Sequence, residues 1–291
     1  MSNANDQSID VAAAGTFDIK DLGTVRRLGF GAMRITGPGV WGEPADPAAA
    51  RAVLRRAVDL GVDFIDTADS YGPAVSEEII AQALHPYPSG LRIATKAGFV
   101  RTGPNQWHML GRPDYLRQQV ELSLRRLRVD VIDLFQLHRI DPAVPAEDQF
   151  GVLKELQDEG KVRALGLSQV SVQDIKAAGQ VFTVATVQNR FNLTDRSSAD
   201  VLDHATAEGI GFIPWAPVSA GELAKPGGPV DTIAHELGAT PAQVALAWVL
   251  QASPVMLPIP GTASVAHLQD NLGAATLTLP ADAVARLDAA G

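Results

Sequence analysis

The sequence predicts an α/β protein with the fold of a (β/α)8 TIM barrel, preceded by a short N-terminal β-hairpin. Short apolar runs alternate with amphipathic helical segments eight times, and the connections between them are mostly short. No change in composition marks a linker or a second domain. A chain of 291 residues is long enough for one barrel, which typically takes about 250. We expect a flexible tail over residues 1–15 and a single barrel domain over residues 16–291.

Capping and turn residues place the individual elements. The turn Asp21-Leu22-Gly23 predicts a hairpin over residues 16–27. Helices are expected to begin at Asp, Ser, Thr or Pro, as at Asp46-Pro47 and at Ser76, and to stop at glycines such as Gly61. The predicted strands of the barrel cover residues 28–33, 62–66, 91–96, 131–137, 162–167, 184–188, 211–215 and 255–258. The predicted helices cover residues 46–60, 76–84, 113–127, 145–159, 171–178, 197–208, 230–237, 241–251, 265–275 and 280–289.

An open doubly wound sheet is the alternative to a closed barrel. Such a sheet normally carries the phosphate-binding pattern G-x-G-x-x-G after its first strand. Gly29 and Gly31 supply the first two glycines, but Arg34 stands where the third would be. The sequence therefore favours the barrel.

Composition excludes several classes of function. A net charge of -9 argues against a nucleic-acid surface. The chain has no cysteine, which excludes disulfides, thiolate metal sites and cysteine nucleophiles, and it shows no pattern that would bind a metal. No apolar run reaches the roughly 18 residues of a membrane span, and residues 1–15 lack the basic and apolar regions of a signal peptide. We predict a cytoplasmic protein that binds neither membranes nor nucleic acid, as a monomer or a weak homo-oligomer.

Four polar residues fall at the carboxyl ends of three consecutive predicted strands, where barrels carry their catalytic groups. Asp66 ends the second strand and Tyr71 follows in its loop, Lys96 ends the third strand, and His138 ends the fourth. Each has an ordinary structural alternative: Asp66 as a turn cap under Tyr71, Lys96 as a solvated charge, and His138 as a packed core residue. Their convergence on one rim favours catalysis.

The chemistry of this set is acid–base chemistry. A free phenol has a pKa near 10, and a neighbouring ammonium is expected to lower it. Lys96 would tune Tyr71, Asp66 would orient Lys96, and His138 would hydrogen-bond the substrate oxygen or the phenol. A hydrolase using Asp66 and Asp69 on the same barrel would leave Lys96 and Tyr71 without a role.

The sequence resembles the aldo-keto reductase family. The motifs that carry the resemblance occur in the family's order over nearly the whole chain: Asp66-Thr67-Ala68-Asp69-Ser70-Tyr71-Gly72, Ile93-Ala94-Thr95-Lys96, Leu137-His138, Gly166-Leu167-Ser168, Val187-Gln188, Trp215-Ala216-Pro217 and Ile259-Pro260-Gly261. The resemblance implies a barrel that binds a nicotinamide dinucleotide in extended form and passes hydride between it and a carbonyl or alcohol. It also implies that Tyr71 is the general acid and base and that Asp66, Lys96 and His138 complete a tetrad.

The resemblance further implies a cofactor groove. Ser168 and Gln188 match the residues that hydrogen-bond the nicotinamide carboxamide, and Trp215 matches the aromatic residue on which the ring stacks. The other positions implied to contact the cofactor are Met33, Asp66, Ala216, Pro217, Val218, Gly221, Gly261, Thr262, Ser264, His267, Asp270 and Asn271.

Two departures from the family's pattern bear on the cofactor. Gln169 replaces the asparagine that often follows the carboxamide serine. Gly261, Ala263 and His267 occupy positions that often hold a fixed cation for the 2′-phosphate of NADPH, although the hydroxyls of Thr262 and Ser264 could still bind it. We expect NADPH, with NADH possible.

The predicted function is an NADPH-dependent carbonyl reductase acting on a small-molecule aldehyde or ketone, or reversibly on an alcohol. Residues 98–112 carry Phe99, Trp107, His108 and Met109 and are expected to wall the substrate pocket together with Trp41. The absence of a long segment after the closing helix predicts an open pocket. The alternatives are an NAD-linked alcohol dehydrogenase on the same barrel and a cofactor-sensing regulatory subunit.

Overall fold

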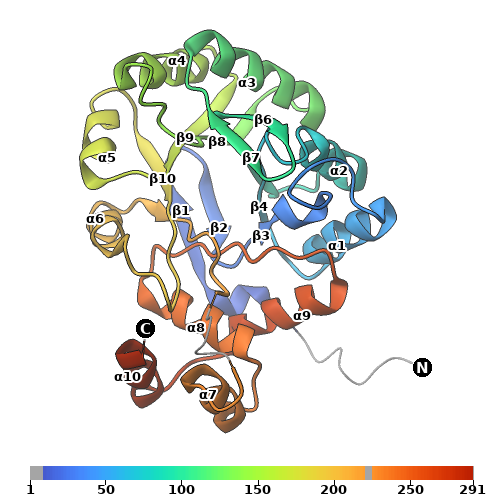
Figure 1. Ribbon diagram of the computed structural model, residues 1–291, viewed down its shortest axis with the longest axis vertical. Helices are drawn as coiled ribbons and strands as arrows, with labels where there is room; N and C mark the ends of the chain where they lie inside the picture. Colours follow the sequence, from blue (N-terminus) through green and yellow to red (C-terminus); the bar gives the residue numbers. More distant parts are fainter. Residues whose placement is uncertain (1–8, 220–224, 291) are drawn as a thin grey trace.

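Seven parallel strands form a curled sheet that is surrounded by helices (Figure 1). The computed structural model describes residues 9–219 and 225–290. The order of the strands around the sheet is β11-β10-β9-β8-β5-β4-β3. Their bounds are β3 (Phe30–Gly31), β4 (Phe64–Asp66), β5 (Arg92–Ala97), β8 (Ile132–Leu137), β9 (Val162–Ser168), β10 (Val184–Gln188) and β11 (Gly211–Phe212). This arrangement confirms the predicted (β/α)8 barrel.

The segment predicted as the eighth strand closes the ring between β11 and β3. The backbone N–H of Phe212 donates to the carbonyl of Val255 over 2.9 Å, and the N–H of Gly29 donates to the carbonyl of Pro258 over 3.0 Å. A single parallel bridge joins Phe212 to Met256, so the segment does not form a full strand. Its prolines, Pro254, Pro258 and Pro260, explain this irregularity because they cannot donate to a ladder.

The ten predicted helices are confirmed within one or two residues. They are α1 (Pro47–Asp59), α2 (Val75–Leu84), α3 (Pro113–Leu127), α4 (Ala146–Asp158), α5 (Val172–Ala178), α6 (Ala199–Glu208), α7 (Pro229–Leu237), α8 (Pro241–Ala252), α9 (Val265–Gly273) and α10 (Ala281–Ala290). None of the helices in the described part of the chain has both the length and the apolar character needed to cross a membrane.

The start of α2 differs from the prediction. Ser76 was expected to cap this helix, but the capping position is Ala74, with a left-handed φ of 69°. The hydroxyl of Ser76 instead lies inside the fold, 2.7 Å from that of Thr67 and 3.1 Å from the carbonyl of Ala32. Ser76 therefore ties α2 to the loop that follows β4.

The N-terminal hairpin plugs the barrel at the end where the strands begin. Strands β1 (Thr16–Ile19) and β2 (Gly23–Arg26) pair antiparallel, as predicted. Ile19, Leu22 and Val25 are buried against barrel-interior side chains such as Phe64 and Leu134. The hairpin thus seals the end of the barrel opposite the predicted site.

The residues just before this hairpin are more ordered than expected. The sequence predicted a flexible tail as far as Gly15, but Val11–Ala14 form the 3-10 helix η1. Val11 is only 1% exposed and packs in the core with Leu28. This apolar anchor places residues 9–15 with the barrel rather than with a tail.

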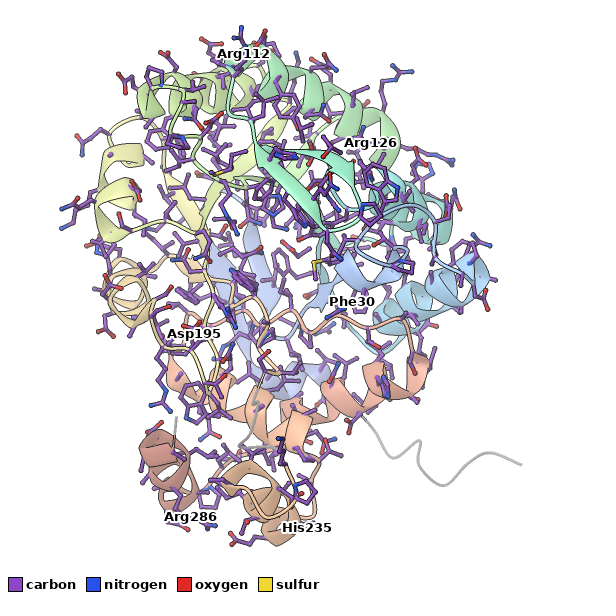
Figure 2. The ribbon with its side chains drawn as sticks, in the orientation of Figure 1. Phe30, Arg112, Arg126, Asp195, His235 and Arg286 are labelled. Atoms are coloured by element: carbon purple, nitrogen blue, oxygen red, sulfur yellow. The ribbon has the colours of Figure 1, made fainter. Side chains whose placement is uncertain are left out.

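A second hairpin stands at the opposite end, in front of the barrel in Figure 1. Its strands β6 (Phe99–Gly103) and β7 (Gln106–Met109) occupy most of the segment predicted as a long loop. Asn105, with φ of 56°, makes its turn. In Figure 2, Phe30 lies near the middle of the molecule and Arg126 lies where α3 passes α2.

Candidate active site

A buried ion pair joins the ends of β4 and β5. The Nζ atom of Lys96 lies 2.6 Å from Oδ1 of Asp66 and also donates to the carbonyl oxygen of Thr67 over 2.6 Å. The parallel register, which pairs Asp66 with Ala94, brings the two side chains to the same rim. Each charge is neutralised by the other, so both can be kept out of water.

Two glutamine side chains hold the second oxygen of Asp66. Gln188 at the end of β10 donates to Oδ2 over 2.9 Å, and Gln136 on β8 donates over 3.2 Å. Gln136 in turn accepts from the hydroxyl of Thr186 over 3.3 Å. Gln136 was not among the predicted site residues, although it lies two positions before His138 and so faces the same side of the strand.

Tyr71 sits above this ion pair in the loop after β4. Its side chain is 7% exposed, and the Nζ atom of Lys96 lies 5.2 Å from the centre of its ring. Burial raises the pKa of the phenol above its usual 10, although the ammonium of Lys96 pulls this pKa downward. The lowering effect of the ammonium is as expected, but desolvation of the phenol is larger, so the pKa of Tyr71 is raised overall. At neutral pH the phenol keeps its proton and can donate it.

His138 completes the group as a neutral imidazole. Its ring meets that of Tyr71 edge to face with 6.0 Å between centroids, and its Nδ1 lies 3.4 Å from the hydroxyl of Ser70. Burial, followed by the nearby charges of Lys96, Arg139 and Arg101, holds the pKa of His138 well below 6.5. The four side chains proposed from the sequence thus come together on one rim.

Aromatic side chains from the β6–β7 hairpin border this group. The ring of Phe99 lies 4.7 Å from that of His138, and the ring of Trp107 lies 6.4 Å from those of both His138 and Tyr71. All these contacts are edge to face, a favourable geometry for aromatic pairs. The hairpin gives the site an apolar wall directly beside its acid–base groups.

Arg101 fastens this wall to the barrel. Its guanidinium makes five hydrogen bonds to backbone carbonyls of Gly39, Val40, Ser70, Gly103 and Gln106. It also stacks against two indole rings, at 3.5 Å from the centre of Trp107 and 5.8 Å from that of Trp41. One side chain therefore joins the loop after β3, the Tyr71 loop and the hairpin.

The indole of Trp215 is held by its edge. Its Nε1 donates to Oε1 of Gln169 over 2.6 Å, and the same oxygen accepts from the backbone N–H of Arg190 over 2.9 Å. The guanidinium of Arg190 lies 5.2 Å from the centre of the ring, and Asp195 pairs with Arg190 over 3.1 Å. Trp215 remains partly exposed. Gln169, which was not among the predicted site residues, thus holds this ring in place.

Ser168 and Gln188 lie at the ends of the adjacent strands β9 and β10, and both are nearly buried. The hydroxyl of Ser168 accepts a hydrogen bond of 3.0 Å from Nη1 of Arg139. Arg139 belongs to no recognisable sequence motif. Its position directly after His138 is the one sequence feature that could have indicated a place in the site.

The remaining predicted cofactor positions lie on three segments. Met33 is in the 3-10 helix η2 (Ala32–Ile35). Ala216, Pro217 and Val218 follow Trp215, and Val218 is 40% exposed. Gly221 falls outside the residues that the structure describes.

The third segment is the turn into α9. Ser264 caps this helix by accepting from the N–H of His267, while Thr262 accepts from the N–H of Ser264 over 3.0 Å. Asp270 accepts from the hydroxyl of Thr240 over 3.0 Å and so is tied to the start of α8, whereas its neighbour Asn271 is 8% exposed.

The stem of the Arg34 side chain, from η2, passes beside this turn. A Cβ atom added at Gly261 would lie 2.5 Å from the carbonyl oxygen of Gly31 and 3.7 Å from Cγ of Arg34. The close backbone approach requires glycine at position 261. The stem of Arg34 thus runs beside the residue at which the sequence lacked a cation, and Arg34 forms no ion pair with a described carboxylate.

The residues described by the structure include no group of three or more His, Asp or Glu side chains that could hold a metal ion. The site instead offers groups suited to an organic cofactor. These are a partly exposed indole, a serine and two amides at strand ends, and a glycine turn that leads into a capped helix N-terminus. The donor set fits the nicotinamide dinucleotide that the sequence implied.

Comparisons with known proteins identify the family. A model of the aldo/keto reductase family matches residues 27–291. An uncharacterized oxidoreductase of Schizosaccharomyces pombe is 52% identical over 288 residues, covering 99% of this chain and 94% of that protein. Pyridoxine 4-dehydrogenase of Escherichia coli is 42% identical over 275 residues, covering 92% and 96%.

A solved structure of an aldo-keto reductase from Klebsiella pneumoniae in complex with NADPH matches with a TM-score of 0.80 and 25% identity, over 94% of each chain. The chain described here therefore belongs to the aldo/keto reductase family and is an NAD(P)H-dependent oxidoreductase.

Proposed function

We propose that this enzyme reduces an aldehyde or ketone with NADPH and that Tyr71 donates the proton. The observation that carries the proposal is the environment of Tyr71. Its phenol is buried and keeps its proton at neutral pH, while the Lys96–Asp66 ion pair lies directly beneath it. A group that must give up a proton during the reaction is best placed when it holds that proton beforehand and a cation stabilises the anion left behind.

Each residue of the rim has a separate role in the proposed reaction. The nicotinamide, when bound, supplies the hydride. Tyr71 gives its proton to the carbonyl oxygen, and the ammonium of Lys96 stabilises the resulting phenolate. Neutral His138 donates a hydrogen bond to the same oxygen, which orients the carbonyl without adding a proton. Phe99 and Trp107 exclude water from the reacting centre.

The cofactor would lie along the ends of the strands. Trp215 would stack on the nicotinamide ring, with its own orientation fixed by Gln169 and Arg190. Ser168 and Gln188 would contact the carboxamide. The turn from Gly261 to Ser264, at the N-terminus of α9, would take a phosphate.

Arg34 supports NADPH over NADH. The 2′-phosphate of NADPH needs a cation, and the turn before α9 has none of its own. Arg34 lies beside Gly261, is exposed and has no carboxylate partner among the described residues. We assign it to the 2′-phosphate. The NADPH-bound relative from Klebsiella pneumoniae adds support for this cofactor.

Alcohol oxidation is the second candidate, because the Escherichia coli relative is named pyridoxine 4-dehydrogenase. Oxidation needs Tyr71 to accept a proton and therefore to begin as a phenolate. Burial raises the pKa of Tyr71 and so disfavours this form. We expect reduction to dominate at neutral pH and oxidation to gain as pH rises toward the pKa of the phenol.

Cofactor binding is the first test. Quenching of tryptophan fluorescence by NADPH and by NADH would be measured on the wild type and on Trp215→Ala. We expect tighter binding of NADPH, weakened when Trp215 is removed. If neither NADPH nor NADH bound to the wild type, the proposed function would be rejected.

Arg34→Ala tests the cofactor preference in the same assay. We expect about a tenfold or greater loss of NADPH affinity, the effect of losing one charged hydrogen bond, with little change for NADH. Arg163→Ala is the matched control, since Arg163 is exposed near the start of β9, at the other end of the barrel. An equal loss for both dinucleotides would contradict the assignment of Arg34.

A further inference from the structure

Of the cations described above, Lys96, Arg101 and Arg139 lie nearest the proposed acid–base group, and the first two are fully engaged. Lys96 is paired with Asp66. Arg101 directs its guanidinium into five hydrogen bonds with backbone carbonyls, which matches the five N–H donors that an arginine possesses. Lys96 gives two of its donors to Asp66 and Thr67 and faces the Tyr71 phenol. Neither Lys96 nor Arg101 therefore has a donor free for a substrate.

Arg139 is different. Its Nη1 donates to the carbonyl of His138 over 2.6 Å and to the hydroxyl of Ser168 over 3.0 Å. Its Nε and Nη2 make no hydrogen bond with any described residue, and neither is a fully buried orphan atom. Arg139 also forms no ion pair in the described chain. It is thus a partly buried cation with accessible donors and no anion.

An unpaired, partly buried cation is costly to keep unless a ligand supplies its counter-charge. Burial lowers the pKa of Arg139, because desolvation makes the charged form of the guanidinium less stable. The cost is the more notable because the whole chain carries a net charge of -9 and has more carboxylates than cations to offer. No carboxylate of the described residues lies within ion-pair distance of Arg139.

The position of Arg139 relates it to the reacting carbonyl. Its guanidinium lies 5.3 Å from the centre of the Phe99 ring, and that ring lies 4.7 Å from the ring of His138. Phe99 is thus in contact both with the cation and with the imidazole that would orient the carbonyl oxygen. A substrate lying along Phe99 would reach His138 and Tyr71 at one end and Arg139 at the other.

We propose that Arg139 selects carbonyl substrates that carry a carboxylate, with an apolar or aromatic body that packs on Phe99 between the two functional groups. Arginine suits this role because its planar donors match the two oxygens of a carboxylate. The inference rests on the proposed reductase function and adds to it the class of substrate. Arg139 has one competing use, which is to hold Ser168 for the cofactor.

The test compares two aldehydes that differ in charge at the far end. They are 4-carboxybenzaldehyde and its neutral methyl ester, methyl 4-formylbenzoate. The ratio of their kcat/KM values with NADPH would be measured on the wild type, Arg139→Gln and Arg139→Lys, together with the Kd of NADPH for each protein.

We expect the wild type to prefer the carboxylate by about tenfold or more, the effect of one charge-assisted hydrogen bond. Arg139→Gln should abolish this preference at saturating NADPH, whatever its effect on the Kd of the cofactor through Ser168. Arg139→Lys, which keeps the charge but loses the planar fork, should restore part of it.

Other results would overturn the inference. A wild type that reduces both aldehydes equally well would refute it without any variant. Loss of NADPH binding in Arg139→Gln, with the substrate ratio unchanged, would assign Arg139 to the cofactor instead. A wild type that binds NADPH but reduces neither aldehyde would also refute the inference, whereas failure to bind NADPH would reject the proposed function itself.

Discussion

The ammonium of Lys96 and the carboxylate of Asp66 lie 2.6 Å apart, and neither side chain is more than 2% exposed. Their pairing connects the end of β4 to β5 at the point where the barrel carries its candidate acid–base group. Asp66 is further fixed by Gln136 and Gln188 from two other strands. Four strands of the sheet are thus joined through one carboxylate, so this ion pair supports the fold as well as the proposed chemistry.

Lys96→Met is expected to destabilise the protein by about 3–5 kcal/mol, because it leaves the charge of Asp66 buried without a partner. Chemical denaturation at neutral pH measures this loss. Asp66→Asn should destabilise similarly, whereas the double variant should lose less than the sum of the two, since no uncompensated charge remains. Strict additivity would show that the two groups do not interact as the structure places them.

Asp69 should destabilise the protein as pH rises. Its carboxyl is 4% exposed, and its Oδ1 finds no hydrogen-bond partner in the described chain. Burial, followed by the nearby charge of Glu77, raises the pKa of Asp69 well above its usual 3.8. The folded state therefore binds a proton that the unfolded state releases, and stability is lost as pH climbs from 3.8 through the folded pKa.

Asp69→Asn should remove this pH-dependent loss of stability. The free energy of unfolding of the variant should therefore rise relative to that of the wild type as pH increases, by on the order of 1–3 kcal/mol once Asp69 ionises. Unfolding by urea at several pH values measures the difference. Asp200→Asn, at an exposed position of α6, is the control and should leave the pH dependence of stability unchanged. A pH-independent difference for Asp69→Asn would contradict the raised pKa.

His138 should make the fold sensitive to acid. Its pKa is held well below 6.5, so below that pH the unfolded state binds a proton that the folded state does not. Its contribution to stability is complete above pH 6.5 and falls as the pH drops toward the folded pKa, by at most about 1.4 kcal/mol per pH unit. His138→Gln should flatten this part of the stability profile, whereas His108→Gln, at an exposed position of β7, should leave it unchanged.

Arg101→Lys should loosen the hairpin wall. Lysine retains the charge but cannot make the planar set of five bonds to Gly39, Val40, Ser70, Gly103 and Gln106. We expect amide hydrogens of residues 99–109 to exchange about tenfold faster or more, because local opening becomes less costly. Arg112→Lys, at an exposed arginine whose ion-pair partner among the described residues is Asp114, is the control. Equal exchange in both variants would argue against the clamp.

The elements of this fold were predictable because their signals are local. Asp46 and Pro47 begin α1 as expected, and the apolar run before Asp66 and the run before His138 form the predicted strands. Since parallel strands end on one rim, placing Asp66, Lys96 and His138 at strand ends was enough to bring them together.

The features that were missed depend on tertiary contacts. The five carbonyls bound by Arg101 come from segments up to 62 residues away, and Arg34 meets Gly261 only because the barrel closes. Ala74 adopts a left-handed conformation that its residue type does not favour, so the start of α2 was misplaced. The raised pKa of Tyr71 follows from the depth of its burial, which the sequence does not state.

The central claim is that Tyr71 donates the proton. Single-turnover reduction of an aromatic aldehyde by bound NADPH, followed by loss of nicotinamide absorbance, tests it on the wild type and Tyr71→Phe. We predict a rate about 100 to 10,000 times lower in the variant, the usual contribution of a general acid, with unchanged affinity for NADPH. A variant that binds NADPH and reduces the aldehyde at the rate of the wild type would contradict the account.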